Sequence, residues 1–181
     1  MVVVAVPAQH LRAVITSARS LASADALILS PSKGIELGSC LRMTEVLAGM
    51  LGERFSGRIG ALSGPNLARE VMAGRPSATC VAFHDLARAG TVPHLLMGDT
   101  LRIYASDDVV GCEIGGAVKN VIAIAAGVAD GLGYGMTRKP RSSHGGLAEL
   151  SRLGVALGGQ PLTVLGLGRA MASRATPALL S

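Results

Sequence analysis

A lysine and an amide stand together within the longest apolar segment of the chain, residues 111–133. At about 100° per residue, the bulky side chains of this segment fall on one side of a helix. The opposite side carries Lys119 and Asn120 among very small or polar residues. Such a face lets another backbone or a ligand approach closely, with a proton donor and a neutral hydrogen-bond donor projecting into the gap. The alternative is a core helix whose Lys119 extends its ammonium group to water.

A second lysine follows a predicted strand at 26–30, in the run Ser32-Lys33-Gly34-Ile35-Glu36. Ligands of open α/β sheets bind at the carboxyl ends of strands. Gly34 allows the backbone to turn tightly, and Lys33 offers a point charge to a phosphate or a developing oxyanion. The alternative is an ordinary exposed lysine in a turn.

A third candidate loop, residues 63–66, follows a predicted strand at 59–62. Asn66 is placed to cap a helix that begins at Leu67, and the N–H groups beyond it can face an anion. The alternative is a strand–helix turn without a ligand.

The elements that would position these loops alternate between strand and helix. Strands are predicted at 2–6, 26–30, 59–62, 78–83 and 101–105, and helices at 9–21, 41–51, 67–73 and 85–97. This alternation is typical of a parallel α/β sheet, in which the β-branched strand 2–6 is expected to be buried on both faces. After a boundary near Ser106, helices dominate, with Asp107 or Asp108 as the N-cap of the long helix.

Three motifs occur in the order found in NAD(P)-dependent glycerol-3-phosphate dehydrogenase of the bacterial type. They are KGIE at Lys33, SGPNLA at Ser63 and GGAVKNVIAIAAGVADGLG from Gly115. The chain resembles this family from about Val2 to about Gly159. The resemblance implies α/β then all-α architecture: a partial Rossmann-like dinucleotide-binding domain at 1–106, and part of a helical, 6-phosphogluconate-dehydrogenase-like substrate domain at 107–181.

The resemblance also implies a reaction and its residues. NAD or NADP would serve as cofactor in the interconversion of dihydroxyacetone phosphate and sn-glycerol 3-phosphate. Lys119 would be the general acid/base, with its pKa lowered by burial beside Lys33. By the same resemblance, Lys33 would contact both the cofactor and the substrate. The substrate would also contact Gly64, Asn66 and Asn120, and the cofactor would contact Ala68.

Three departures separate the chain from the family pattern. The glycine-rich GxGxxG turn that binds the cofactor pyrophosphate is absent from the 181 residues. Residues 136–145 are basic where the family has an apolar segment, and 169–181 lack the family's aspartate and Arg-Asn motif. We therefore expect a chain truncated at both ends, with weak or absent cofactor binding. A pair of compensating frameshifts is a hypothesis for residues 136–145, and a frameshift is an open alternative for 169–181.

Composition restricts the other classes of function. With 2% aromatic residues and a net charge of +5 spread along the chain, a nucleic-acid surface is disfavoured. The three cysteines are far apart and suggest buried free thiols in a reducing cytosol. The four histidines show no ligand spacing, so no metal site is expected. Charged residues interrupt the apolar segment 109–132, so no membrane span is expected.

The sequence thus predicts a cytoplasmic glycerol-3-phosphate dehydrogenase homologue that serves phospholipid biosynthesis, impaired by truncation, with a homodimer as a further option. One alternative is another two-domain dehydrogenase acting on a hydroxyacid or 6-phosphogluconate. A different class is a non-catalytic remnant or interaction module of the same fold. Such a module would pair with a separate nucleotide-binding half through its open sheet edge.

Overall fold

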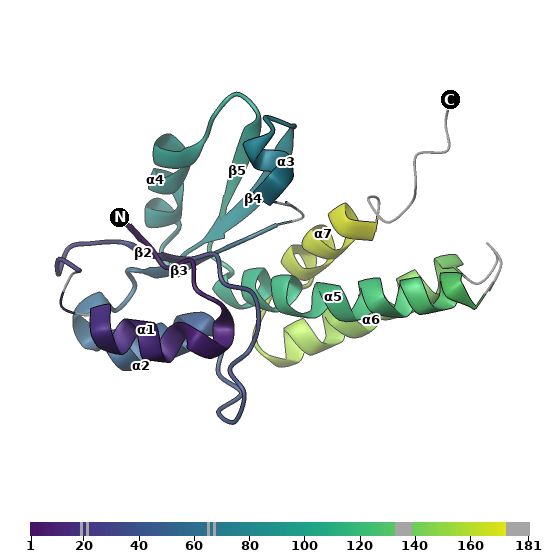
Figure 1. The fold of residues 1–181 in the computed structure, drawn as a ribbon, viewed down its shortest axis with the longest axis horizontal. Helices are drawn as coiled ribbons and strands as arrows, with labels where there is room; N and C mark the ends of the chain where they lie inside the picture. Colours follow the sequence, from purple (N-terminus) through teal and green to yellow (C-terminus); the bar gives the residue numbers. More distant parts are fainter. Residues whose placement is uncertain (19, 21, 65, 67, 133–138, 173–181) are drawn as a thin grey trace.

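The computed structural model describes residues 1–18, 20, 22–64, 66, 68–132 and 139–172. Within these ranges it leaves out the side chains at 119, 122, 126, 129, 130, 139–144, 147 and 168–172. A sheet with helices on both faces forms one part, and three helices form an arm that extends from it (Figure 1).

The sheet has five strands in the order β1-β2-β3-β4-β5. They are β1 (Val2–Val3), β2 (Ile28–Ser30), β3 (Ile59–Ser63), β4 (Ser77–Ala82) and β5 (Leu101–Ser106). Neighbours pair in parallel except β3 and β4, which are antiparallel. The Rossmann-like α/β class is confirmed, but the sheet is mixed. After β3 the chain passes through the short helix α3 (Ala68–Met72) and re-enters the sheet at the same end at which β3 finishes, so β4 runs in the opposite direction.

The first strand differs from the prediction of a strand buried on both faces. Only Val2 and Val3 form β1, and their side chains are 38% and 48% exposed. β1 is the edge of the sheet, and the backbone N–H of Val6 bonds to the hydroxyl of Ser32 instead of extending the strand.

Alternate residues of the strands face two separate layers of helices. One layer contains η1 (Ala8–His10), α1 (Leu11–Ala18), α2 (Met43–Leu51) and η3 (Glu53–Phe55). Ile28 and Ile59 pack there with Leu11, Met43 and Leu47. On the other face, α4 (Leu86–Leu96) packs Ala89 and Val92 against Leu29, Val81 and Ile103. With this period of two, the strands in the middle of the sheet are buried on both faces.

The arm consists of α5 (Val109–Gly131), α6 (Lys139–Ala156) and α7 (Pro161–Ala172). Asp108 caps α5, as predicted, because its carboxylate accepts from the backbone N–H of Gly111 at 2.7 Å. The same carboxylate accepts from the N–H of Gln160 at 2.8 Å, which ties the start of α7 to the start of α5. Val109 and Cys112 pack against Ala61 and Ala82 of the sheet.

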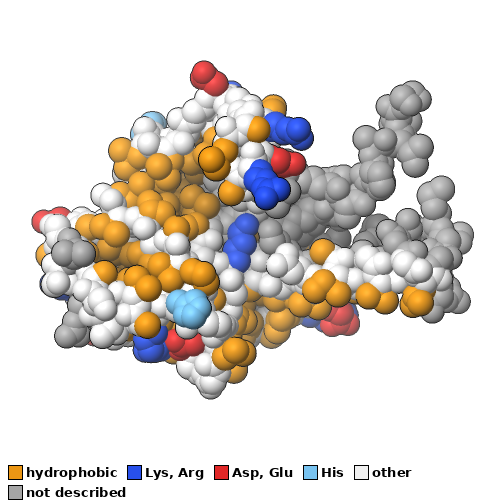
Figure 2. Space-filling model, viewed as in Figure 1, with side chains coloured by type: hydrophobic (Ala, Val, Ile, Leu, Met, Phe, Trp, Pro, Cys, Tyr) orange, Lys and Arg blue, Asp and Glu red, His pale blue; other side chains and the backbone are white. Residues whose placement is uncertain are grey.

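Among the described side chains of α5, the bulky ones are buried or half-buried in the first half of the helix and exposed in the second half. Ile114 packs with Leu150 and Val164, with Val118 beside them, as the helical periodicity predicts. Further along, the exposed residues are Val121, Ile124, Val128 and Leu132, at 63%, 68%, 55% and 62%. Hydrophobic side chains accordingly line the arm in Figure 2. Among the described helices, none has both the length and the apolar character needed to cross a membrane.

Candidate functional site

Lys33 lies beside Gly64, although the two residues are 31 positions apart in the sequence. The Lys33 Nζ atom donates a hydrogen bond to the carbonyl oxygen of Gly64 at 3.3 Å, and its side chain is half-buried. The two loops follow β2 and β3. Because these strands are parallel, both loops begin at the carboxyl ends of the strands, on the same side of the sheet. The structure thus brings together two of the three motifs at a strand end, where ligands of this architecture bind.

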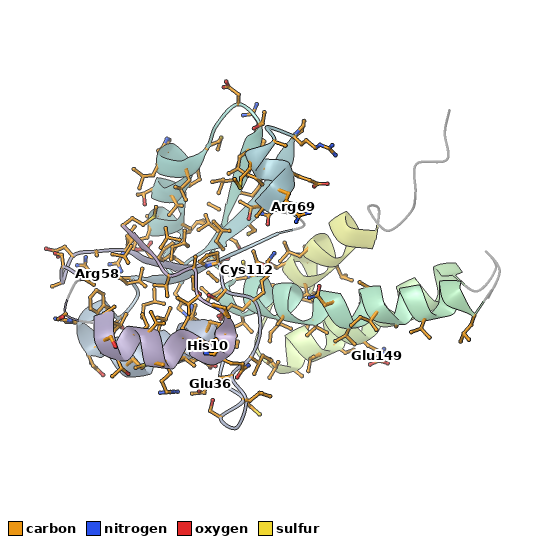
Figure 3. The ribbon with its side chains drawn as sticks, viewed as in Figure 1. His10, Glu36, Arg58, Arg69, Cys112 and Glu149 are labelled. Atoms are coloured by element: carbon orange, nitrogen blue, oxygen red, sulfur yellow. The ribbon has the colours of Figure 1, made fainter. Side chains whose placement is uncertain are left out.

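Side chains of η1 and α1 hold the Lys33 loop in place. Arg12 forms two hydrogen bonds with the carboxylate of Glu36, at 2.9 and 2.8 Å, and Gln9 donates to the carbonyl oxygen of Ile35 at 2.9 Å. Hydrogen bonds from Arg12 and then Ser39 lower the pKa of Glu36 to about 2. Figure 3 labels Glu36 in this loop, close to the purple α1. The bidentate pair fixes the orientation of the loop.

Gly64 has no room for a side chain. A Cβ atom there would lie 2.8 Å from the Thr79 Cα atom and 2.9 Å from the carbonyl oxygen of Ala78. Asn66 is half-buried and Ala68 is exposed. The predicted cap at Asn66 stays a prediction, because residues 65 and 67 lie outside the described residues.

Gly116 of α5, which belongs to the third motif, lies next to Lys33 and the end of β3. A Cβ atom on Gly116 would overlap the hydroxyl of Ser63 and lie 3.7 Å from the Cγ atom of Lys33. The small face of α5 therefore permits a close approach, as its sequence predicts, and it is Ser63 that approaches. Lys33, Ser63, Gly64 and Gly116 together form what we call the strand-end junction.

Lys119 and Asn120 lie in α5, three and four positions after Gly116. Residues with this spacing share one face of a helix with Gly116. The side chain of Asn120 is exposed, and that of Lys119 lies outside the described side chains. The approach of the Lys119 ammonium group to Lys33 and Gly64 therefore stays a prediction.

Ser63 was not recognised as a site residue from the sequence. Its side chain is 3% exposed, and its hydroxyl is the buried side-chain atom for which the described residues offer no hydrogen-bond partner. Buried hydroxyl groups are normally hydrogen-bonded. The only sequence signal was its place at the start of the SGPNLA motif, where a serine is also common as a simple turn residue.

Glu113 is a second group that the sequence left without a role. Its carboxylate accepts from the Thr44 N–H at 2.9 Å, the Thr44 hydroxyl at 2.6 Å and the Arg42 Nη1 atom at 2.8 Å. These bonds join α2 to α5 one turn before Gly116. Burial raises the pKa of Glu113, while the hydrogen bonds from Thr44 and the charge of Arg42 act in the opposite direction. The sequence feature that could have pointed to Glu113 is its carboxylate on the polar face of an otherwise apolar helix.

The described residues contain no group of His, Cys, Asp and Glu side chains that could hold a metal ion. All three cysteines are free thiols. Cys112 is buried and Cys80 half-buried, but Cys40 is exposed, so the prediction of buried thiols is wrong for Cys40.

Two family models match the chain in sequence order. The model of the NAD-dependent glycerol-3-phosphate dehydrogenase N-terminus matches residues 1–89, and that of the C-terminus matches residues 108–173. A glycerol-3-phosphate dehydrogenase [NAD(P)+] of Nocardia farcinica is 49% identical over 172 residues, covering 92% of this chain and 51% of the relative. That of Streptomyces coelicolor is 45% identical over 178 residues, covering 97% and 53%. The chain thus spans about half the length of the curated relatives it matches.

Solved structures show the same similarity. The glycerol-3-phosphate dehydrogenase of Coxiella burnetii superposes with a TM-score of 0.84 at 33% identity, covering 97% of this chain and 54% of that one. The enzyme of Saccharomyces cerevisiae has a TM-score of 0.81 at 24% identity, covering 96% and 54%, and supports the fold alone. With both family models in order, and relatives nearly half identical along nine-tenths of its length, this chain belongs to the NAD-dependent glycerol-3-phosphate dehydrogenase family.

Proposed function

We propose that this chain carries the substrate-reducing part of a glycerol-3-phosphate dehydrogenase, which interconverts dihydroxyacetone phosphate and sn-glycerol 3-phosphate with NAD(P)H. The observation that supports this proposal is the strand-end junction, where Lys33, Gly64 and Gly116 meet. A cation beside a carbonyl oxygen at the end of two parallel strands suits an anionic, oxygen-rich substrate.

Each predicted site residue has a role in this proposal. Lys119 donates a proton to the carbonyl oxygen of dihydroxyacetone phosphate as that oxygen gains negative charge, and removes it in the reverse direction. Lys33 stabilises the same charge and orients the substrate. The neutral contacts with the substrate come from Gly64, Asn66 and Asn120.

Lys33 and Ala68 are the residues that would contact NAD or NADP. The bound cofactor supplies the hydride in one direction and accepts it in the other. Both contacts follow from the match of the KGIE and SGPNLA motifs to the family pattern, and Ala68 is exposed. The 181 residues contain no GxGxxG turn for its pyrophosphate, so we expect this chain alone to bind cofactor weakly.

The wider setting is proposed on the same basis. We place the boundary between the partial dinucleotide-binding domain and the partial helical domain near Ser106, where β5 ends. We also propose that the protein is located in the cytoplasm, that it serves phospholipid biosynthesis and that it forms a homodimer.

Ligand binding tests this function on the 181-residue chain itself. We expect glycerol 3-phosphate to raise the thermal unfolding midpoint of the chain. The Lys33→Ala substitution should lower the affinity for glycerol 3-phosphate about tenfold, a loss of about 1.4 kcal/mol in binding free energy. Arg152→Ala, which removes an exposed cation on α6, is the matched control and should leave affinity unchanged. Fluorescence titration with NADH and NADPH, followed by turnover of dihydroxyacetone phosphate, completes the test. Equal affinity in the Lys33→Ala variant, or a preference for 6-phosphogluconate, would contradict the proposal.

A second candidate is a non-catalytic interaction module. It is favoured by the exposure of Val2 and Val3 on the edge strand β1, since unpaired strand edges recruit other strands. Sedimentation of the chain with and without a separately produced nucleotide-binding half of a family member distinguishes it: tight association without turnover of dihydroxyacetone phosphate supports the module.

A further inference from the structure

Two of the three cysteines lie against one another although 32 positions separate them. Cys80 belongs to β4 and Cys112 to the first turns of α5. The Cys112 Sγ atom lies 3.8 Å from the carbonyl oxygen of Cys80, and the two residues pack in the same cluster as Ala61 and Ala82. Figure 3 labels Cys112 at the end of α5 that meets the sheet.

The pair adjoins the strand-end junction on both of its elements. Cys80 is the cross-strand partner of Ser63 in the β3–β4 ladder. Cys112 stands four positions before Gly116, on the same face of α5. Any bond between the two sulfur atoms would therefore fix α5 to the sheet at the place where Gly116 packs on Ser63.

The two thiols differ in their readiness to react. Cys80 is half-buried and therefore within reach of a small oxidant, whereas Cys112 is fully buried. The neighbouring Cys112 thiol lowers the pKa of Cys80, whereas the neighbouring Cys80 thiol, together with burial, raises the pKa of Cys112. The thiolate is the nucleophilic form of cysteine, so Cys80 reacts first.

We propose that Cys80 and Cys112 form a site of oxidative modification that hydrogen peroxide converts into an intramolecular disulfide. The Cys80 thiolate attacks one peroxide oxygen, the O–O bond breaks, and the products are a sulfenic acid on Cys80 and one water after proton uptake. The Cys112 sulfur then attacks the Cys80 sulfur, an S–S bond replaces the S–O bond, and a second water leaves. The balance is two thiols and one peroxide to one disulfide and two waters, and an added dithiol reverses it.

The test uses the 181-residue chain with Cys40 removed, because an exposed thiol would form bonds between chains. Cys40 has a positive φ of 57°, so Cys40→Gly suits the backbone. After peroxide treatment, blocking of free thiols and digestion without reductant, we expect one linked peptide that contains Cys80 and Cys112. The disulfide should raise the thermal midpoint by on the order of 5 °C, and dithiothreitol should restore the original value.

Controls separate this outcome from unspecific oxidation. Cys80→Ala and Cys112→Ala should each abolish both the linked peptide and the thermal shift. Oxidation of the chain unfolded in guanidinium should give a much lower yield of the Cys80–Cys112 peptide. The wild-type chain with Cys40 alkylated provides the same readout if Cys40→Gly lowers the yield of folded chain. Accumulation of sulfinic acid on Cys80 with Cys112 still reduced, or disulfides only through Cys40, would overturn the proposal.

Discussion

The hydroxyl of Ser63 occupies the space that a side chain on Gly116 would need. This contact joins the end of β3 to α5, and the Lys33 Cγ atom would lie 3.7 Å from the same Cβ position on Gly116. The distance between the sheet and the helix that carries Lys119 is therefore set by a glycine and a serine. Packing at this junction leaves no room for one additional carbon atom.

Gly116→Ala is expected to destabilise the chain by about 1–3 kcal/mol, because the new methyl group forces α5 away from β3. Urea denaturation followed by circular dichroism measures this change. Gly127→Ala is the matched control: it lies on the same helix with no other atom within 4 Å of its added Cβ. That variant should stabilise the helix by about 0.5–1 kcal/mol.

Ser63→Ala is expected to rescue part of the Gly116→Ala defect, because it removes the atom that the methyl group would meet. By itself, Ser63→Ala should cost little, since the hydroxyl it removes is buried without a hydrogen-bond partner among the described residues. A double-mutant cycle of the two substitutions gives the coupling energy directly. Strict additivity of their effects would show that the two residues do not determine the spacing.

Gly64→Ala should destabilise the chain more than an alanine elsewhere in the sheet domain. The added Cβ would meet the Cα atom of Thr79 and the carbonyl oxygen of Ala78, both of them backbone atoms that cannot rotate away. Gly90→Ala in α4 is the control, because no atom lies within 4 Å of its Cβ. Equal unfolding midpoints for the two variants would contradict this account of Gly64.

The order of the elements could be predicted from the sequence because apolar periodicity is local. Each strand in the middle of the sheet and each α-helix of the first hundred residues lies within a few positions of its predicted range, whereas the short helix η3 was not predicted. The antiparallel pairing of β4 could not be predicted in this way, because strand direction depends on how the chain returns after β3. The exposure of β1 likewise depends on its place at the sheet edge, which a β-branched run does not reveal.

The candidate site could be predicted at the level of motifs but not of contacts. The strand-end location of Lys33 and Gly64 follows from the rule that parallel strands end at one edge. The roles of Ser63 and Glu113 required knowledge of which residues from distant elements meet them. Periodicity placed Glu113 on the polar face of α5 and gave no indication that Arg42 and Thr44 would surround it.

Glu113→Gln is expected to lower the free energy of unfolding by roughly 3 kcal/mol, the range for a buried ion pair that loses one charge. The amide NH2 group of glutamine would face the hydrogen-bond donors of Thr44. The mostly buried Arg42 would also lose its ion pair with Glu113. Glu149→Gln removes an exposed carboxylate that pairs with Arg152, and should change stability by less than about 1 kcal/mol. Chemical denaturation of both variants decides the matter, and equal effects would show that the Glu113 bonds do not hold α2 to α5.

Glu36 should give the chain a specific sensitivity to acid. Because Arg12 and Ser39 lower its pKa from 4.5 to about 2, the folded state binds this proton less readily than the unfolded state. Its stabilising contribution is therefore complete above pH 4.5 and is lost as the pH falls towards 2. The difference in stability between the wild-type chain and Glu36→Gln should be constant above that window and shrink within it.

Carboxyl titration followed by NMR measures the same effect at the residue itself. In Arg12→Ala the pKa of Glu36 should move back towards 4.5, and the Lys33 loop should lose the bidentate bond that orients it. Arg152→Ala, which removes an arginine from a different ion pair, should leave the Glu36 titration where it was. If Glu36 titrates near 4.5 in the unmodified chain, the bond to Arg12 does not persist in solution, and α1 does not hold the loop that presents Lys33.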